Sequence, residues 1–155
     1  MPEMKAIAAM ALNRTIGYHQ ELPWHIPEEL KHFRTTTLHQ TLLMGRKTFE
    51  SMGSHPLPQR TTYILTTKNT KYKGVQTIHS INELANINET IWLCGGAKIY
   101  EQFLPLCSEL ILTVIQKNFD GDTFFPPFEH LFSLKKIINR TDNFEIQHWI
   151  RKNKN

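Results

Sequence analysis

The segment TIWLCGGAKIYEQFL, residues 90–104, contains a complete pattern of strand, turn and helix. Residues 90–94 are short, mostly apolar and followed by two glycines, which predicts a buried strand that stops at a turn. In residues 97–104 the apolar side chains recur at helical spacing and form one stripe of Ile99, Tyr100, Phe103 and Leu104. A buried strand that leads directly into such a helix is typical of a parallel sheet covered by helices.

The same alternation extends from this segment in both directions along the chain. Further strands are predicted at residues 5–12, 41–45, 61–67, 75–80 and 109–116. Further helices are predicted at residues 27–36, 46–52 and 81–87. Residues 13–17 are expected to form a turn that pivots on Gly17, and residues 121–128 a loop. Two last strands, 132–139 and 144–152, predict a C-terminal hairpin and therefore an antiparallel edge of a mostly parallel sheet.

Composition narrows the class of protein. The chain has 155 residues, 40% of them apolar, and we expect a single globular domain, residues 1–155. Its net charge of +4 suits small anionic molecules and does not require a nucleic acid. No apolar run approaches the roughly 18 residues of a membrane span. Cys94 and Cys107 form no CxxC motif, which favours free thiols and a cytoplasmic location.

Two adjacent acids begin the helix predicted at residues 27–36. Glu29 shares a helix face with Leu30 and Phe33, and this face should look inward. Glu28 lies about 100° around the helix axis and should face water, where an acid suits the helix dipole. Glu29 could itself be only a first-turn acid, or it could await a partner that the protein does not supply.

Several strand ends carry groups that suit a phosphate. Carboxyl ends of parallel strands lie at one edge of the sheet, where ligands bind. Glycines 95–96 would let a phosphate approach the backbone, although the GxGxxG motif is absent. Residues 45–48 place two cations at a helix start, and residues 66–68 add two hydroxyls and a cation. Each feature alone could be structural, but their coincidence favours a phosphate-bearing ligand.

Other candidate residues are less informative. Arg60 could clamp a carboxylate through two parallel hydrogen bonds, or it could be an ordinary surface arginine. The eight histidines show no metal-binding spacing, so no metal site is predicted. Ser51 and Ser108 have no partnered His or Asp pattern, so nucleophilic catalysis is not expected.

Five motifs together resemble those of the bacterial dihydrofolate reductases, in the same order and at similar spacing. They are LPWHIPEELKHF (22–33), LLMGRKTFESMG (42–53), PLPQR (56–60), CGGAKIYEQFLP (94–105) and LTVIQKNFDGDTFFPP (112–127). The resemblance implies an α/β fold of three layers, with an eight-stranded, mostly parallel sheet, an antiparallel C-terminal edge strand and about four flanking helices. It also implies reduction of 7,8-dihydrofolate to 5,6,7,8-tetrahydrofolate with NADPH as cofactor.

For the substrate, the resemblance gives Glu29 its missing partner. The N3–H and 2-amino group of a dihydropterin are two adjacent donors that match one carboxylate. Thr113 is then expected to support Glu29, and Arg60 to hold the α-carboxylate of the glutamate tail. The full set of substrate-binding residues implied is Ala8, Ala9, Glu29, Leu30, Phe33, Met52, Leu57, Arg60 and Thr113. The catalytic residues implied are Glu29, Leu22, Trp24 and Tyr100.

For the cofactor, the resemblance implies a cis peptide at Gly95–Gly96 and a 2′-phosphate site that favours NADPH over NADH. The implied residues are Ala9, Ile16, Gly17, Gly45, Arg46, Lys47, Thr48, Thr66, Thr67, Lys68, Gly95, Gly96, Ala97, Lys98, Ile99, Tyr100 and Thr123. Residues 16–24 correspond to a mobile loop that closes over the site. Asp122 should steady this loop through hydrogen bonds to its backbone.

The chain departs from the common bacterial pattern at Glu29, where Asp is frequent, and at Ala97 and Lys98, where Gly and Arg are frequent. The expected partners are dihydrofolate and antifolate inhibitors, with no nucleic acid, no membrane and a monomeric state. Two other functions remain open on the sequence alone. One is an NADPH-dependent reductase of riboflavin biosynthesis, which Glu29, Phe33 and Arg60 disfavour. The other is a small basic binding module, which would need a clustered basic stripe.

Overall fold

Parallel pairing brings six strands together in one sheet. The computed structural model describes residues 1–19 and 21–153. Strand order in the sheet is β5-β4-β3-β6-β1-β7-β10-β9. The parallel strands are β1 (Met4–Ala11), β3 (Thr41–Gly45), β4 (Thr61–Leu65), β5 (Gln76–Ile78), β6 (Ile91–Leu93) and β7 (Glu109–Ile115).

The C-terminal hairpin completes the sheet. Strand β10 (Phe144–Arg151) pairs antiparallel with β7 on one side and with β9 (Phe132–Arg140) on the other. The predicted eight-stranded, mostly parallel sheet with antiparallel C-terminal pairing is therefore confirmed. The antiparallel strand β10 lies second from the edge of the sheet, between β7 and β9. Its Phe144 and Ile146 are therefore buried, whereas most of the edge strand β9 is exposed.

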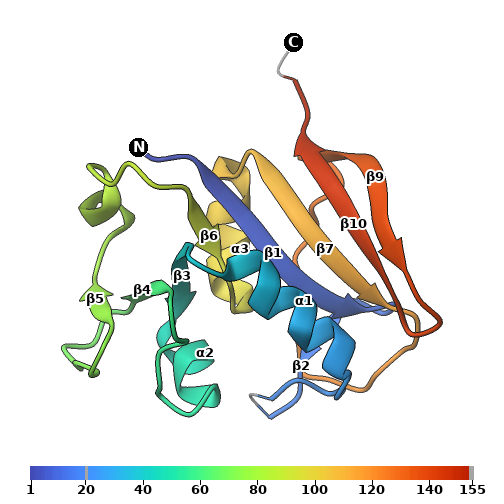
Figure 1. Cartoon of the computed structure of the whole chain (residues 1–155), viewed down its shortest axis with the longest axis horizontal. Helices are drawn as coiled ribbons and strands as arrows, with labels where there is room; N and C mark the ends of the chain where they lie inside the picture. The colour runs from blue at the N-terminus through green and yellow to red at the C-terminus, as the bar shows by residue number, and fades with distance from the viewer. Residues whose placement is uncertain (20, 154–155) are drawn as a thin grey trace.

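Helices cover both faces and give three layers (Figure 1). Helices α1 (Pro27–Thr37) and α2 (Arg46–Ser51) lie over one face, and α3 (Ala97–Phe103) lies over the other. About four helices were expected, and the described residues form three α-helices. The segment predicted as a helix at residues 81–87 is instead a short 3₁₀ turn, η1 (Ile81–Leu84), and a second 3₁₀ turn, η2 (Leu104–Leu106), follows α3.

Strand alternation divides β1 between two cores. Ala6 and Ala8 face α3 and pack in the core that contains Tyr100. Ala9 and Ala11 face the opposite side and pack with Trp24. The β1–β6 ladder ends at Ala6↔Leu93, whereas β1 continues to Ala11 paired only with β7. The sheet therefore opens beside the carboxyl end of β1, which is where ligands bind in folds of this kind.

A second, two-stranded sheet corrects two sequence predictions. The expected turn at residues 13–17 contains β2 (Thr15–Gly17), which pairs with β8 (Thr123–Phe124) inside the expected loop at 121–128. The residue with left-handed backbone is Arg14 (φ 69°) and not Gly17. The prediction failed because the pairing partner lies about one hundred residues away, beyond the reach of a local pattern.

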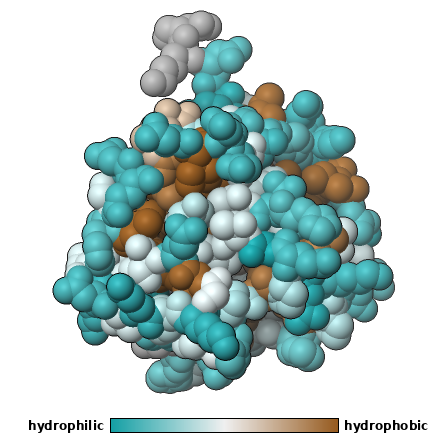
Figure 2. Space-filling model, turned by 60° about the vertical axis from the view of Figure 1, so that its left-hand side comes forward, coloured by the Kyte–Doolittle hydropathy of each residue, from teal (hydrophilic) through white to brown (hydrophobic). Residues whose placement is uncertain are grey.

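One face of the molecule carries apolar groups among hydrophilic residues. Figure 2 shows one face of the molecule, on which hydrophilic residues surround the apolar groups. Scattered exposed apolar side chains are ordinary for globular proteins. Among the described residues, no helix is long and apolar enough to cross a membrane.

Both cysteines are free, and burial raises the pKa of Cys94 and of Cys107 to about 12, so neither thiol ionises at neutral pH.

Candidate active site

Glu29 is a buried carboxylate in the first turn of α1. Pro27 starts this helix, where its missing N–H removes no intrahelical bond. Glu29 is only 8% exposed, while its neighbour Glu28 is exposed, as the helical spacing predicted. Burial raises the pKa of Glu29, and the indole N–H of Trp24 offsets part of that rise. Among the described residues Glu29 forms no ion pair, so its charge has no internal cation to balance it.

Trp24 and Tyr100 complete this part of the site. Trp24 is buried, and its Nε1 has no hydrogen-bond partner within normal limits among the described residues. Its N–H therefore acts on Glu29 through proximity and not through a hydrogen bond of normal geometry. The Tyr100 hydroxyl donates to the carbonyl oxygen of Ile7 at 2.7 Å, in the opening between β1 and β6. Burial holds the pKa of Tyr100 well above its usual range, so it remains a neutral donor.

Thr113 lies close to this pocket but does not contact Glu29 through a hydrogen bond. It is buried on β7, directly opposite Ala9 of β1. No hydrogen bond between Thr113 and Glu29 occurs in the part of the chain that the structure describes. The expected support of Glu29 by Thr113 therefore stays a prediction.

Arg60 is oriented by the C-terminal half of α1. Its guanidinium donates to the carbonyl oxygens of Arg34 and Pro58 (2.6 Å for the latter) and to the Thr37 hydroxyl at 3.3 Å. Thr37 is fully buried, and its hydroxyl in turn donates to the carbonyl of Phe33 at 2.8 Å. Because arginine has five N–H donors, two remain free to hold a carboxylate. No motif in the sequence indicates this role of Thr37, so it was not predicted from the sequence.

For the carboxylate-bearing substrate that the sequence resemblance implies, replacing Thr37 with Val should raise KM about three- to tenfold with little change in kcat. Valine keeps the shape of threonine but removes the acceptor that fixes Arg60 Nε, worth roughly 1 kcal/mol. Thr37→Ser retains the hydroxyl and should behave like the parent in steady-state kinetics. An unchanged KM in the valine variant would mean that the two carbonyls alone orient Arg60.

The ends of three adjacent strands form the candidate cofactor cradle. Register places Gly45 opposite Leu65, so Arg46 and Thr66 begin neighbouring segments at the same edge. The Gly45 N–H donates to the carbonyl of Gly95 at 2.8 Å, which joins the ends of β3 and β6. The Gly95–Gly96 peptide is cis, as predicted, and Gly95 has φ of 105°, which side chains rarely adopt. The strand-end residues predicted from separate motifs therefore do lie side by side.

Polar contacts organise the outer end of this cradle. Arg46 pairs with Glu50 at 2.7 Å, and the Tyr72 hydroxyl donates to the same carboxylate. The Tyr72 hydrogen bond, followed by the Arg46 contact, lowers the pKa of Glu50, which is therefore ionised and neutralises part of the Arg46 charge. Lys47, Thr67 and Lys68 are exposed and remain open to solvent.

His79 is a further residue at this end that the motif analysis missed. Its Nδ1 lies 2.7 Å from the carbonyl oxygen of Thr66 and must donate, because a carbonyl only accepts. Its backbone N–H donates to Glu83, which with Ser80 forms the capping box of η1. The sequence signal was HSINE, a serine followed three residues later by glutamate.

The expected hydrogen bond from the loop to Asp122 is present. The backbone N–H of His19 donates to Asp122 Oδ2 at 3.0 Å, and the Asp122 N–H donates to the carbonyl of Gly17 at 3.0 Å. The His19 N–H, then the Thr123 hydroxyl, lower the pKa of Asp122, so this acceptor stays charged. Within the loop at residues 16–24, Gln20 lies outside the described residues.

The other predicted residues divide into buried and exposed sets. Ala8, Gly95, Ile99 and Tyr100 are buried around the opening beside β1. Partly buried are Ala9, Ile16, Leu30, Phe33, Gly45, Thr48, Leu57, Thr66, Gly96, Ala97 and Thr123, whereas Gly17 is buried at the β2–β8 pairing. Leu22, Met52 and Lys98 are exposed.

Comparison with known proteins agrees with this arrangement. Residues 3–150 match the family model described as dihydrofolate reductase. The dihydrofolate reductase of Staphylococcus aureus is 40% identical over 126 residues, which cover 81% of this chain and 79% of that protein. That of Haemophilus influenzae is 42% identical over 123 residues, covering 77% and 76% respectively.

A solved structure extends the similarity to the whole fold. Dihydrofolate reductase from Enterococcus faecalis, complexed with NADP(H) and RAB-propyl, has a TM-score of 0.91 to this chain at 32% identity. The match covers 97% of both chains. The sheet order, the buried acid on α1 and the glycine pair after β6 thus occur in a chain that belongs to the dihydrofolate reductase family.

Proposed function

We propose that the chain reduces 7,8-dihydrofolate to 5,6,7,8-tetrahydrofolate with NADPH, and that Glu29 binds and polarises the pterin. The role of Glu29 is supported by one observation: its carboxylate is buried and has no ion-pair partner among the described residues. A buried carboxylate is costly unless it is paired and hydrogen-bonded. The adjacent N3–H and 2-amino donors of a dihydropterin supply both needs at once.

Glu29 acts in this proposal by polarisation. While its two oxygens hold N3–H and the 2-amino group, it does not reach N5, which must receive the proton. The carboxylate raises the basicity of N5, and a water molecule delivers the proton. NADPH supplies the hydride that is accepted at C6. The loop at residues 16–24, anchored through Asp122, keeps bulk water from this region.

The distance between Glu29 and Arg60 suits an elongated substrate. Arg60 is fixed to Thr37, eight residues after Glu29 on the same helix. At a rise of 1.5 Å per residue the two positions are about 12 Å apart along α1. A pterin joined through an aminobenzoyl ring to a glutamate spans such a distance, with Leu30 and Phe33 beside the ring. A compact ribosylaminopyrimidine would leave Arg60 without a partner.

The cofactor phosphate is proposed to bind at Arg46, Thr67 and Lys68. Replacing Arg46 with Met and Thr67 with Val should raise KM for NADPH about tenfold and leave KM for NADH nearly unchanged, because only NADPH carries the 2′-phosphate. Lys71→Met, an exposed lysine in the adjoining polar loop, is the matched control. Equal losses with both cofactors would remove the 2′-phosphate assignment.

The direct test of function is a mixture of purified protein, NADPH and dihydrofolate, followed by absorbance at the nicotinamide band. Loss of absorbance that depends on dihydrofolate is expected, and its absence would contradict the proposal.

We also propose one domain of residues 1–155, a monomeric state, a cytoplasmic location and inhibition by antifolates. The continuous sheet from β1 to β10 supports the single domain, and the two free thiols support the location. Sedimentation velocity will test the monomer.

A further inference from the structure

A cavity of about 380 Å³ lies beside Trp24, between the segment that precedes α1, the end of β7 and the β9–β10 turn. Its lining residues are Pro23, Trp24, His25, Ile26, Ile115, Gln116, Lys117, Phe119, Asp142 and Asn143. Of the residues assigned above to the active site, only Trp24 lines it. None of Glu29, Leu30, Phe33 and Arg60 lines it, so the cavity is distinct from the region around Glu29 and adjoins that region at Trp24.

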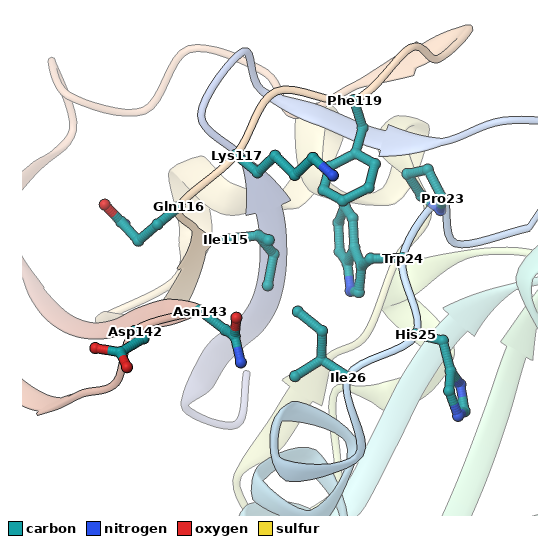
Figure 3. Close-up of a pocket in the computed structure, with 10 residues that line it drawn as sticks. All are labelled: Pro23, Trp24, His25, Ile26, Ile115, Gln116, Lys117, Phe119, Asp142 and Asn143. Carbon is teal, nitrogen blue, oxygen red and sulfur yellow. The ribbon is translucent and has the colours of Figure 1, made fainter.

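The inner surface of this cavity suits a flat aromatic ring. The rings of Trp24 and Phe119 lie with centroids 5.7 Å apart and planes inclined at 56°. Ile26 and Ile115 extend the apolar surface opposite them (Figure 3). The volume lies within the range of roughly 300–1,000 Å³ that is usual for small-molecule sites. One or two fused rings would fit against these four side chains.

The positive charge at this cavity comes from Lys117, which lies beside Phe119. Lys117 Nζ lies 5.4 Å from the centre of the Phe119 ring, and Lys117 forms no ion pair among the described residues. Figure 3 shows the Asn143 amide directed into the hollow, whereas the Asp142 carboxylate points away from it. A ligand in the hollow therefore meets a cation and an amide, and its favourable charge is negative.

The walls are held in place by hydrogen bonds that do not depend on a ligand. Asn13 Nδ2 and the Thr15 hydroxyl donate to the carbonyl of Phe119 at 2.8 and 2.9 Å. The N–H of Gln116 donates to the carbonyl of Asn143 at 2.9 Å, which ties the β9–β10 turn to the end of β7. A preformed cavity loses little conformational freedom on binding, which favours affinity.

We propose that this cavity is a second binding site, which takes a small aromatic carboxylate. The ring lies against Trp24 and Phe119, the carboxylate pairs with Lys117, and the Asn143 amide hydrogen-bonds to it. The site does not exclude dihydrofolate, since Glu29, Leu30, Phe33 and Arg60 do not line it. A ligand bound in this cavity changes the environment of the Trp24 side chain, which lies between the cavity and Glu29.

The first experiment titrates 2-naphthoate into ¹⁵N-labelled protein and follows the three tryptophan indole N–H signals. The indoles of Trp92 and Trp149 donate to Gln40 and Gln147 and serve as internal references, and Trp24→Phe identifies the Trp24 signal. A saturable shift of the Trp24 signal alone is expected. Saturating dihydrofolate, without NADPH, should leave the Kd of 2-naphthoate within about threefold of its original value. A Kd that rises in proportion to dihydrofolate, or no shift at all, would overturn the proposal.

The second experiment separates specific binding from general adhesion. Lys117→Gln should weaken 2-naphthoate about fivefold, the size expected of a partly exposed ion pair, and should leave neutral 2-naphthalenemethanol unaffected. Lys136→Gln, an exposed lysine on β9, is the control and should change neither affinity. Phe119→Leu should weaken both compounds. Equal losses from the two lysine variants, or an equal loss of both compounds from Lys117→Gln, would contradict the assigned site. Unchanged NADPH-dependent reduction in Lys117→Gln confirms that the variant is folded.

Discussion

Replacing Glu29 with Gln is expected to reduce kcat with dihydrofolate at least about 100-fold, the lower end of what removal of one positioned electrostatic group costs. Glutamine fills the same volume, but it turns one carboxylate oxygen into an N–H₂ group that faces the donors of the pterin. The complementary pair of hydrogen bonds is then lost, together with the charge that polarises the ring. Stopped-flow measurement of NADPH oxidation will separate the chemical step from product release.

Glu28→Gln is the matched control for this substitution. Glu28 is the preceding residue of the same helix and is exposed. We expect nearly parental kinetics, because its charge is screened by water and faces away from the pocket. Equal losses in the two variants would show that the effect comes from the helix N-terminus and not from the pocket.

The same Glu29→Gln substitution should stabilise the protein near neutral pH. Burial raises the pKa of Glu29, so the folded state binds its proton more tightly than the unfolded state does. Its contribution to stability is fully present below the ordinary glutamate pKa and is lost as pH rises through the raised value. Gln carries no charge at any pH. Urea unfolding should therefore find the variant more stable at pH 7, with the difference shrinking as pH falls through the raised pKa of Glu29 and levelling off below about 4. A difference independent of pH would contradict burial as the cause.

Gly121→Ala is expected to lower the free energy of unfolding by about 1–3 kcal/mol and kcat by about tenfold. A Cβ at this position would overlap the Thr15 methyl group and lie 2.7 Å from the carbonyl oxygen of Gly17. Because that oxygen accepts the N–H of Asp122, the ribbon of β2 and β8 must separate to admit the methyl group. The Asp122 carboxylate then loses its contact with His19, and the loop loses its anchor.

Asp120→Ala provides the control, since Asp120 is an exposed neighbour on the same segment. Thermal unfolding and steady-state kinetics of both variants should show losses only for Gly121→Ala. A destabilised Gly121→Ala variant with parental kcat would mean that attachment of the loop is not needed for catalysis.

The βα units of this protein were predictable because their signals are local. Residues 41–45 were predicted as a strand and form β3 with the same bounds, since an apolar run ending in glycine needs no distant information. The inward face of Glu29 followed from helical spacing alone. The strand-end groups at Arg46, Thr66 and Gly95 followed from the rule that parallel strands end at one edge.

Contacts between distant segments were decided only by the tertiary structure. No local pattern indicated that β2 pairs with β8 or that Arg60 is fixed by Thr37. The number of helices was overestimated because the apolar pattern at 81–87 cannot distinguish one 3₁₀ turn from a short α-helix.

The sequence by itself determined the eight strands of the main sheet, the buried acid and the edge at which the parallel strands end, because each follows from a pattern within a few residues. The tertiary structure alone decided how β2 pairs with β8, how Arg60 is oriented, and where the cavity beside Trp24 lies. These depend on side chains brought together from segments up to about one hundred residues apart, and packing of the whole chain sets their separation.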